Sequence, residues 1–96
     1  MIDSGGTICQ AAEALMKDGA NEVVIAATHP IFSEPAVERL AKSVATEVIV
    51  TNTLPLSDEA LAMDKLTQLS IAPLVSRAIR EVFEDGSVTS MFEGRA

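Results

Sequence analysis

The stretch MIDSGGTICQAAEAL at the start of the chain places a carboxylate, two hydroxyls and a glycine pair directly before an expected helix. Two adjacent glycines allow a tight turn and let the main chain approach a ligand closely. The amides of Gly5, Gly6 and Thr7 can converge at the helix N-terminus, which is an anion-binding arrangement. Ser4 and Thr7 add hydroxyl donors, and Asp3 can accept hydrogen bonds from sugar hydroxyls. The chemistry expected of this loop is recognition of a phosphorylated sugar.

The same pentapeptide also has a purely structural interpretation. A Ser-Gly-Gly-Thr string is a common way to enter a helix, with Ser or Thr as the cap. No Gly-Lys-Ser/Thr follows it, so it is not a Walker-type loop, and it is not a dinucleotide fingerprint. Phosphate loops normally follow a buried strand, whereas only Met1 and Ile2 precede this one. The loop residues by themselves leave both interpretations open.

Two other reactive side chains are single in this sequence. His29, the only histidine, follows an apolar run and precedes Pro30, so it can act as an acid or base or can hold the turn in place. The structural role is favoured. Cys9, the only cysteine, has no base near it in sequence and is expected to pack against a neighbouring helix. Neither a catalytic residue nor a metal ligand is predicted within the chain.

The elements that must position these residues follow from hydrophobic periodicity. A helix is expected over residues 7–17, and a second is expected with Ser33 as its N-cap and Pro35 in its first turn. A short helical turn is expected within 57–63, and a last helix starts at Pro73. The β-branched apolar runs predict strands over residues 22–28, 47–53 and 65–71.

Alternation of helices and strands predicts an α/β fold with a parallel sheet and right-handed crossovers. The strands are nearly continuous in apolar residues, so helices are expected on both faces of the sheet. The 96 residues make one domain or a piece of one. Three parallel strands form a thin sheet whose faces and edges need partners.

The composition excludes several classes of partner. Fourteen acidic against seven basic residues give a net charge of -7, which argues against binding to nucleic acid or a membrane surface. With three Phe and no Trp or Tyr, the chain also lacks a stacking platform for bases. A single cysteine and the absence of a recognisable signal peptide favour a reduced, cytoplasmic protein.

Several motifs in order resemble one enzyme family. The segments MIDSGGT, AAEAL, ATHPIFS, TNTLPLS and SVTSMF resemble the C-terminal part of ribose-phosphate diphosphokinase, also called phosphoribosyl pyrophosphate synthetase. The resemblance runs from Met1 to about Phe92, with Ser4 where the family has Thr and Glu34 where Gly is common. It implies a partial phosphoribosyltransferase-type domain over residues 1–96, from a fragment or a mis-started reading frame of a longer protein.

The resemblance also implies a function. The family transfers the diphosphoryl group of ATP to ribose 5-phosphate, giving phosphoribosyl pyrophosphate and AMP. It requires Mg²⁺, and its two similar α/β domains assemble as hexamers. The resemblance assigns the 5-phosphate of ribose 5-phosphate to Asp3, Ser4, Gly5, Gly6 and Thr7. The ATP pocket and the Mg²⁺ ligands match no residues of this chain, which is therefore expected to be inactive alone.

The tail SVTSMF has an implied regulatory role. In bacterial members this segment contributes to an allosteric site for ADP or phosphate, and Ser87, Thr89 and Phe92 match its positions. A disordered terminus is the alternative. Two further functions stay open: a catalytically silent assembly or regulatory module of the same family, and a fragment of a purine or pyrimidine phosphoribosyltransferase. The segments ATHPIFS and SVTSMF favour the diphosphokinase over the latter.

Overall fold

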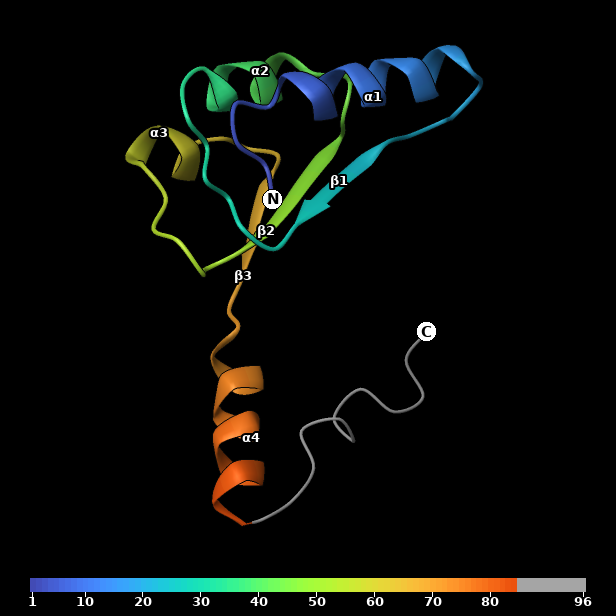
Figure 1. Cartoon of the computed structure of the whole chain (residues 1–96). Coiled ribbons are helices and arrows are strands. Elements are labelled where there is room, and N and C mark those ends of the chain that lie inside the picture. Colours follow the sequence, from blue (N-terminus) through green and yellow to red (C-terminus); the bar gives the residue numbers. More distant parts are fainter. Residues whose placement is uncertain (85–96) are drawn as a thin grey trace.

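A computed structural model of the chain describes residues 1–84 and contains four helices and three strands within them (Figure 1). The elements in chain order are α1 (Gly6–Lys17), β1 (Val24–Ala27), α2 (Ala36–Lys42), β2 (Glu47–Thr51), α3 (Asp58–Leu61), β3 (Leu66–Leu69) and α4 (Ala72–Phe83). The α/β class expected from the sequence is confirmed.

The three strands form one parallel sheet in the order β1-β2-β3. Val24 is paired with Glu47 in β2, and Val48 is paired with Leu66 in β3. Beyond the end of β1, Ile2 forms an isolated parallel bridge with Pro30. The segment before α1 therefore lies where a fourth strand beside β1 would end.

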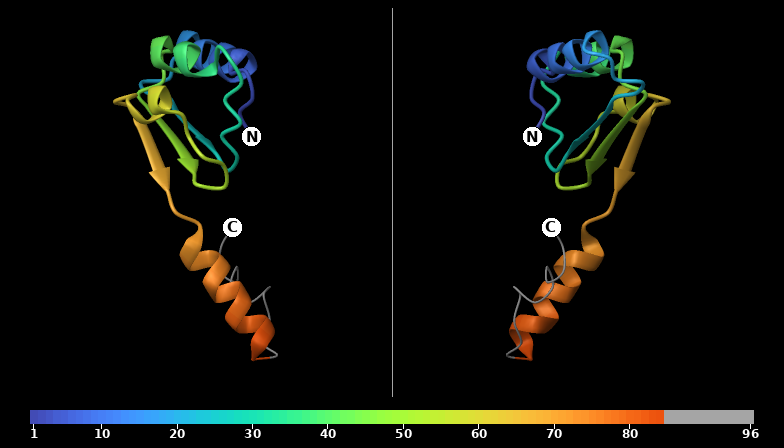
Figure 2. Two further views of the ribbon diagram at one scale, coloured as in Figure 1. Left: turned by 90° about the vertical axis from the view of Figure 1, so that its left-hand side faces the viewer. Right: turned by 90° about the vertical axis from the view of Figure 1, so that its right-hand side faces the viewer.

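The helices α1, α2 and α3 lie over one face of this sheet (Figure 1, Figure 2). The strand order follows the chain order, and right-handed crossovers in a constant direction place every connecting helix on the same side. Covering the second face requires a reversal of strand order, and residues 1–84 contain none. The expectation of helices on both faces is thus met on one face within this part of the chain.

The hydrophobic core lies between the sheet and these helices. Leu40 of α2 and the β2 residues Val48 and Val50 are completely buried. Ala12 of α1 and Met63 after α3 complete the contact. Alternate residues of β2 point to the covered face, which is why Val48 and Val50 are buried and their neighbours are only half-buried.

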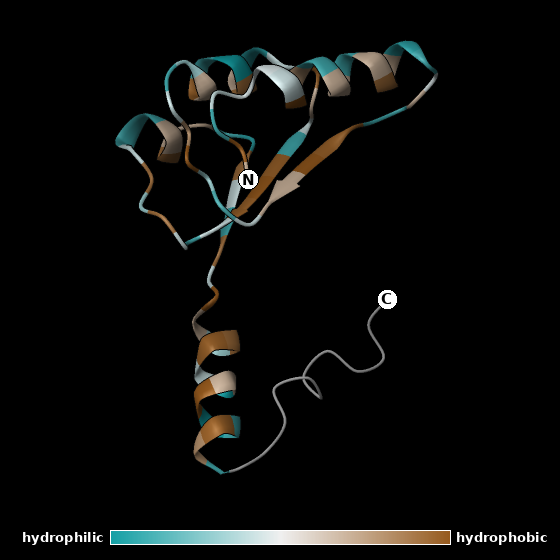
Figure 3. Cartoon of the chain, viewed as in Figure 1, coloured by the Kyte–Doolittle hydropathy of each residue, from teal (hydrophilic) through white to brown (hydrophobic). Residues whose placement is uncertain are grey.

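Helix α4 projects away from the sheet instead of packing on it (Figure 2). Figure 3 shows a hydrophobic stripe along it, and none of its residues is buried. Asn52 connects β2 to the start of α4, since its Oδ1 accepts the Ile71 amide at 2.9 Å and its Nδ2 donates to the Ser70 hydroxyl at 3.4 Å. The apolar face of α4 has no partner within the described residues.

The prediction of Ser33 as the N-cap of the second helix is wrong. The helix begins at Ala36 with Pro35 as its N-cap residue and no side-chain cap. The Ser33 hydroxyl instead donates to the Asp3 carboxylate. By contrast, Ser57 does cap α3, because its Oγ accepts the Ala60 amide at 3.1 Å.

No helix within the described residues is both long and apolar enough to cross a membrane.

Candidate functional site

The loop between Ile2 and α1 is held beside the extension of β1 by two main-chain hydrogen bonds. The Ile2 amide donates to the His29 carbonyl at 3.1 Å, and the Phe32 amide donates to the Ile2 carbonyl at 3.1 Å. These two bonds hold Ile2 beside the segment that follows β1, and the Ile2 side chain is buried in the core. The loop is therefore anchored at both ends, by this pairing and by α1.

Gly5 gives the loop its shape. It adopts the left-handed conformation with φ 80° and ψ -4°, and Gly6 directly after it begins the helix. A left-handed residue followed by a right-handed one turns successive amides toward one point and makes an anion-binding concavity. The first intrahelical bond runs from the Cys9 amide to the Gly5 carbonyl at 3.1 Å.

The first-turn amides of α1 have no partner within the helix itself. Amides before the first intrahelical donor need a cap, water or a ligand. No side chain caps this end, and no acidic residue lies in the first turn of the helix. The positive end of the helix dipole is therefore uncompensated by a carboxylate there, which favours an incoming anion.

Gly6 is needed for a different reason. Its φ is not positive, so its backbone is open to any residue. A Cβ at this position would lie 3.1 Å from Nη1 of Arg39, which itself donates to the Ser4 carbonyl at 3.1 Å. Gly6 thus makes room for an arginine from α2.

Asp3 and Ser33 join the loop to the segment that precedes α2. The Ser33 hydroxyl donates to Oδ1 of Asp3, and both side chains are exposed. The depression beside the loop has a volume of about 340 Å³. It is lined by Met1, Ile2, Asp3, Ser4, Gly5, Gly6, Thr7, Ile8 and Ala11. All five residues predicted for the site therefore border one open cavity.

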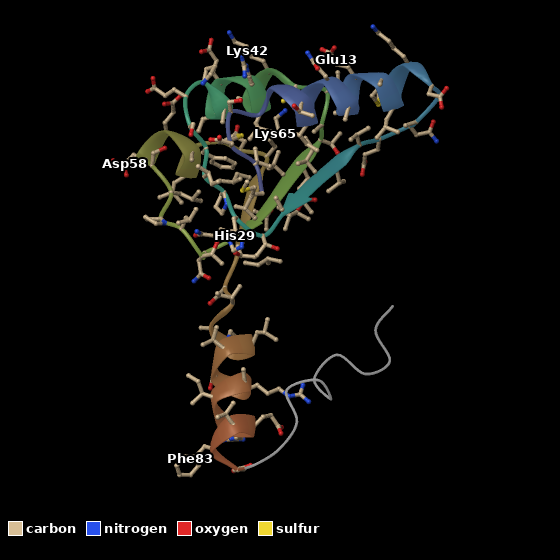
Figure 4. All side chains as sticks on the ribbon, viewed as in Figure 1. Glu13, His29, Lys42, Asp58, Lys65 and Phe83 are labelled. Atoms are coloured by element: carbon tan, nitrogen blue, oxygen red, sulfur yellow. The ribbon has the colours of Figure 1, made fainter. Side chains whose placement is uncertain are left out.

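His29 lies at the end of the sheet, away from α1 (Figure 4). Its Nδ1 is 2.9 Å from the Thr53 hydroxyl, which follows β2. The hydroxyls of Thr51 and Thr53 both donate to the Thr28 carbonyl, at 2.6 and 3.2 Å. His29 thus belongs to a polar cluster that ties the ends of β1 and β2 together, as its structural interpretation predicts.

Cys9 is a packing residue. Burial raises the pKa of its thiol, although the positive charges of Arg39 and Lys65 act in the opposite direction. The thiol is therefore protonated at neutral pH, and a thiol is a poor nucleophile compared with a thiolate.

No cluster of three or more His, Cys, Asp or Glu side chains with metal-binding geometry is found in residues 1–84. Asp3, the carboxylate of the loop, already accepts the Ser33 hydroxyl. Ser87, Thr89 and Phe92, predicted for an effector site, lie outside the described residues.

Sequence reasoning missed Arg39 and the role of Ser33. Arg39 acts on a carbonyl 35 positions away, and Ser33 on a carboxylate 30 positions away. Periodicity reports only which face of a helix is polar, so the sequence carried no local signal for either contact.

The fold and the loop together define an α/β protein with a three-stranded parallel sheet and a left-handed glycine at the entry to its first helix. The chain belongs to the family described as "Phosphoribosyl synthetase-associated domain", whose model matches residues 1–93. Two similar proteins are the ribose-phosphate pyrophosphokinases of Streptomyces coelicolor, 58% identical over 93 residues, and Corynebacterium glutamicum, 58% identical over 96 residues. These alignments cover 97% and 100% of this chain.

A solved structure shows the same fold. The crystal structure of phosphoribosylpyrophosphate synthetase from Mycobacterium smegmatis matches with a TM-score of 0.82 and 56% identity over 90% of this chain. The match covers 28% of that chain, and the curated relatives are covered to 28% and 29% of their length. The chain therefore spans less than a third of the length of the relatives that it matches.

Proposed function

We propose that this chain is the segment of a ribose-phosphate pyrophosphokinase that binds the 5-phosphate of ribose 5-phosphate, in the loop Asp3–Thr7. The observation that carries the proposal is the left-handed Gly5 at an uncapped helix N-terminus, in a chain 58% identical to a pyrophosphokinase. Backbone amides in this arrangement bind phosphate without requiring a basic side chain in the loop.

The loop offers three kinds of contact to such a ligand. The first-turn amides of α1 donate to the phosphate oxygens, and the hydroxyls of Ser4 and Thr7 add neutral donors. Asp3 accepts hydrogen bonds from the ribose hydroxyls through the oxygen that Ser33 does not occupy. The Ser33 contact keeps the carboxylate in place, so Asp3 confers preference for a sugar phosphate over free phosphate.

The whole enzyme would join this half-site to an ATP site. In the proposed reaction, the diphosphoryl group of ATP moves to the anomeric hydroxyl of ribose 5-phosphate, giving phosphoribosyl pyrophosphate and AMP. Mg²⁺ supplies charge neutralisation in such a transfer. The residues that hold ATP and Mg²⁺ belong to other parts of the enzyme. A cytoplasmic homo-oligomer, regulated by ADP or phosphate at Ser87, Thr89 and Phe92, completes the proposal.

A second candidate is a catalytically silent module of the same family. The family description names an associated domain, and the chain covers 28% of a pyrophosphokinase. Such a module would retain the fold and bind other subunits. The names of the relatives favour both candidates over a fragment of a purine or pyrimidine phosphoribosyltransferase.

Nuclear magnetic resonance titration of the ¹⁵N-labelled 96-residue chain tests the loop. Ribose 5-phosphate and inorganic phosphate are expected to shift the amide signals of Gly5–Ile8, whereas ribose without phosphate leaves them in place. Signals in β2 serve as an internal reference. Shifts that are absent from the loop, or that appear mainly elsewhere, would favour the silent module.

Asp3→Asn separates sugar recognition from phosphate recognition. The amide oxygen of Asn can still accept the Ser33 hydroxyl, so the loop geometry is retained while the charge is removed. The variant is expected to bind ribose 5-phosphate more weakly and inorganic phosphate equally well. Equal weakening of both ligands would show that Asp3 shapes the loop instead of contacting the sugar.

A further inference from the structure

We propose that Arg39 of α2 is a positioning residue that sets the direction of the amides in the Asp3–Thr7 loop. The identity of the ligand rests on the function proposed above, but the contact itself does not. Arg39 reaches the loop from a helix that follows β1, and its Nη1 donates to the Ser4 carbonyl at 3.1 Å. It lies in the groove between α1 and α2, whose volume is about 510 Å³.

The hydrogen bond to Ser4 fixes one peptide plane. In a trans peptide the C=O and the following N–H point in opposite directions. Because Arg39 holds the Ser4 carbonyl toward α2, the Gly5 amide is directed to the opposite side of the loop. The left-handed conformation of Gly5 then carries the chain into α1. One arginine contact therefore orients the first donor of the anion-binding concavity.

Gly6 and Arg39 are matched in space. A Cβ on residue 6 would lie 3.1 Å from Nη1 and 3.8 Å from Cζ of Arg39, so the guanidinium lies against the bare Cα of Gly6. A Cβ at position 6 would require the guanidinium to move by a few tenths of an ångström, which perturbs its hydrogen bond to Ser4. The absence of a side chain at Gly6 thus allows Arg39 to reach the Ser4 carbonyl.

The charges around Arg39 support this role. The neighbouring cation of α2, Lys42, is paired with Glu38 at 2.8 Å. No carboxylate is within ion-pair distance of Arg39 among residues 1–84, although Glu38 and Glu13 line the same groove. Figure 4 shows Glu13 and Lys42 on the adjacent helices α1 and α2. The one protein acceptor of the Arg39 guanidinium in this part of the chain is the loop carbonyl.

Binding of inorganic phosphate and of ribose 5-phosphate to the 96-residue chain tests the proposal, with Lys42→Ala as the matched control. Arg39→Ala is expected to weaken binding of both ligands about tenfold. This is the effect of losing one charge-assisted hydrogen bond, here the one from the Gly5 amide to the phosphate. Lys42→Ala removes the same charge one turn away and is expected to change affinity less than twofold. Arg39→Lys, which retains a donor of nearly the same reach, is expected to restore most of the loss. Equal losses in Arg39→Ala and Lys42→Ala would overturn the proposal.

A double-mutant cycle with Gly6→Ala gives a second test. Gly6→Ala is expected to weaken phosphate binding in the native chain and to do so at least threefold less in the Arg39→Ala background, where no guanidinium is displaced. Strictly additive losses would overturn the pairing of Gly6 with Arg39.

The ligand-free protein separates this proposal from the proposed function. Arg39→Ala is expected to shift the Gly5 and Gly6 amide resonances and to speed their hydrogen exchange, whereas Lys42→Ala leaves both unchanged. If the native chain binds neither ligand but these changes occur, the proposed function fails and the positioning role stands. Unchanged Gly5 and Gly6 amides in Arg39→Ala would overturn the positioning role whatever the chain binds.

Discussion

Gly5 and Gly6 are adjacent and identical in type, yet the structure gives them different constraints. Gly5 is left-handed and buried against Ala36, whose Cα would lie 3.5 Å from an added Cβ. Gly6 is helical, and its limit is the guanidinium of Arg39. The sequence predicted that both glycines are needed to keep the backbone close to a ligand. It could not separate the two reasons, because one of them depends on a residue from a distant helix.

Gly5→Val is expected to abolish phosphate binding to the loop and to lower stability by about 1–2 kcal/mol, the cost of a left-handed non-glycine residue. Calorimetric titration with ribose 5-phosphate and chemical denaturation measure the two effects. Gly19→Val is the matched control, since Gly19 has φ 106° but no atom within 4 Å of an added Cβ.

The control should lose comparable stability and retain binding. Phosphate affinity that survives Gly5→Val unchanged would mean that the loop only starts a helix.

At the scale of elements, the sequence predicted what depends on local pattern. The apolar runs at 22–28, 47–53 and 65–71 contain β1, β2 and β3, each shorter than its run. Helix α1 was predicted within one residue of its start. The N-cap of α2 was predicted wrongly, because the Ser33 hydroxyl donates to the Asp3 carboxylate instead of capping the helix. The apolar stripe of α4 was also visible in the sequence, but periodicity cannot say what covers it.

Truncation of an apolar residue is expected to destabilise the protein strongly in helix α2 and hardly at all in helix α4. Leu40→Ala in α2 removes a fully buried side chain and should cost about 2–5 kcal/mol. Ile79→Ala in α4, where the side chain is 65% exposed, should change stability by less than about 0.5 kcal/mol. Urea denaturation followed by circular dichroism measures both.

At a dilution where the chain is monomeric, a large loss in Ile79→Ala would show that α4 packs against the body of the protein.

At the scale of the whole molecule, two apolar surfaces have no cover among residues 1–84. One is α4, where Val82 and Phe83 are 69% and 88% exposed. The other is the uncovered face of the sheet, where Val24 and Leu69 are about half exposed. Surfaces of this kind mark contacts with other chains or other parts of a longer chain. The chain matches only 28% of the length of the Streptomyces coelicolor relative, so the remaining parts of such an enzyme could supply these contacts.

The chain alone is therefore expected to associate with itself, despite its net charge of -7. Its thermal midpoint should rise with protein concentration, because association stabilises the folded form by mass action. Sedimentation at several concentrations gives the mass. The double variant Ile79→Glu, Val82→Glu should reduce association without unfolding the sheet. A sharp transition of a monomer, independent of concentration, would contradict this expectation.

Catalysis is expected to be absent from the isolated chain. Diphosphoryl transfer depends on positioning of ATP and on charge neutralisation, and residues 1–84 contain no metal-binding cluster. AMP formation from ATP and ribose 5-phosphate in the presence of Mg²⁺ should not exceed a buffer blank. Turnover in material proved free of host enzyme would show that the ATP site had been missed.

The strand order also has a consequence for how the chain folds. Because β1, β2 and β3 are neighbours in the sheet in the order in which they occur in the chain, each pairing closes a short loop, first between residues 24 and 47 and then between 48 and 66. These closures cost less chain entropy than pairings between strands farther apart in the chain. The sheet can therefore grow one strand at a time during synthesis. Native-state hydrogen exchange should find the slowest amides in β2, which has a partner on both sides, and the first to open in the lone bridge at Ile2.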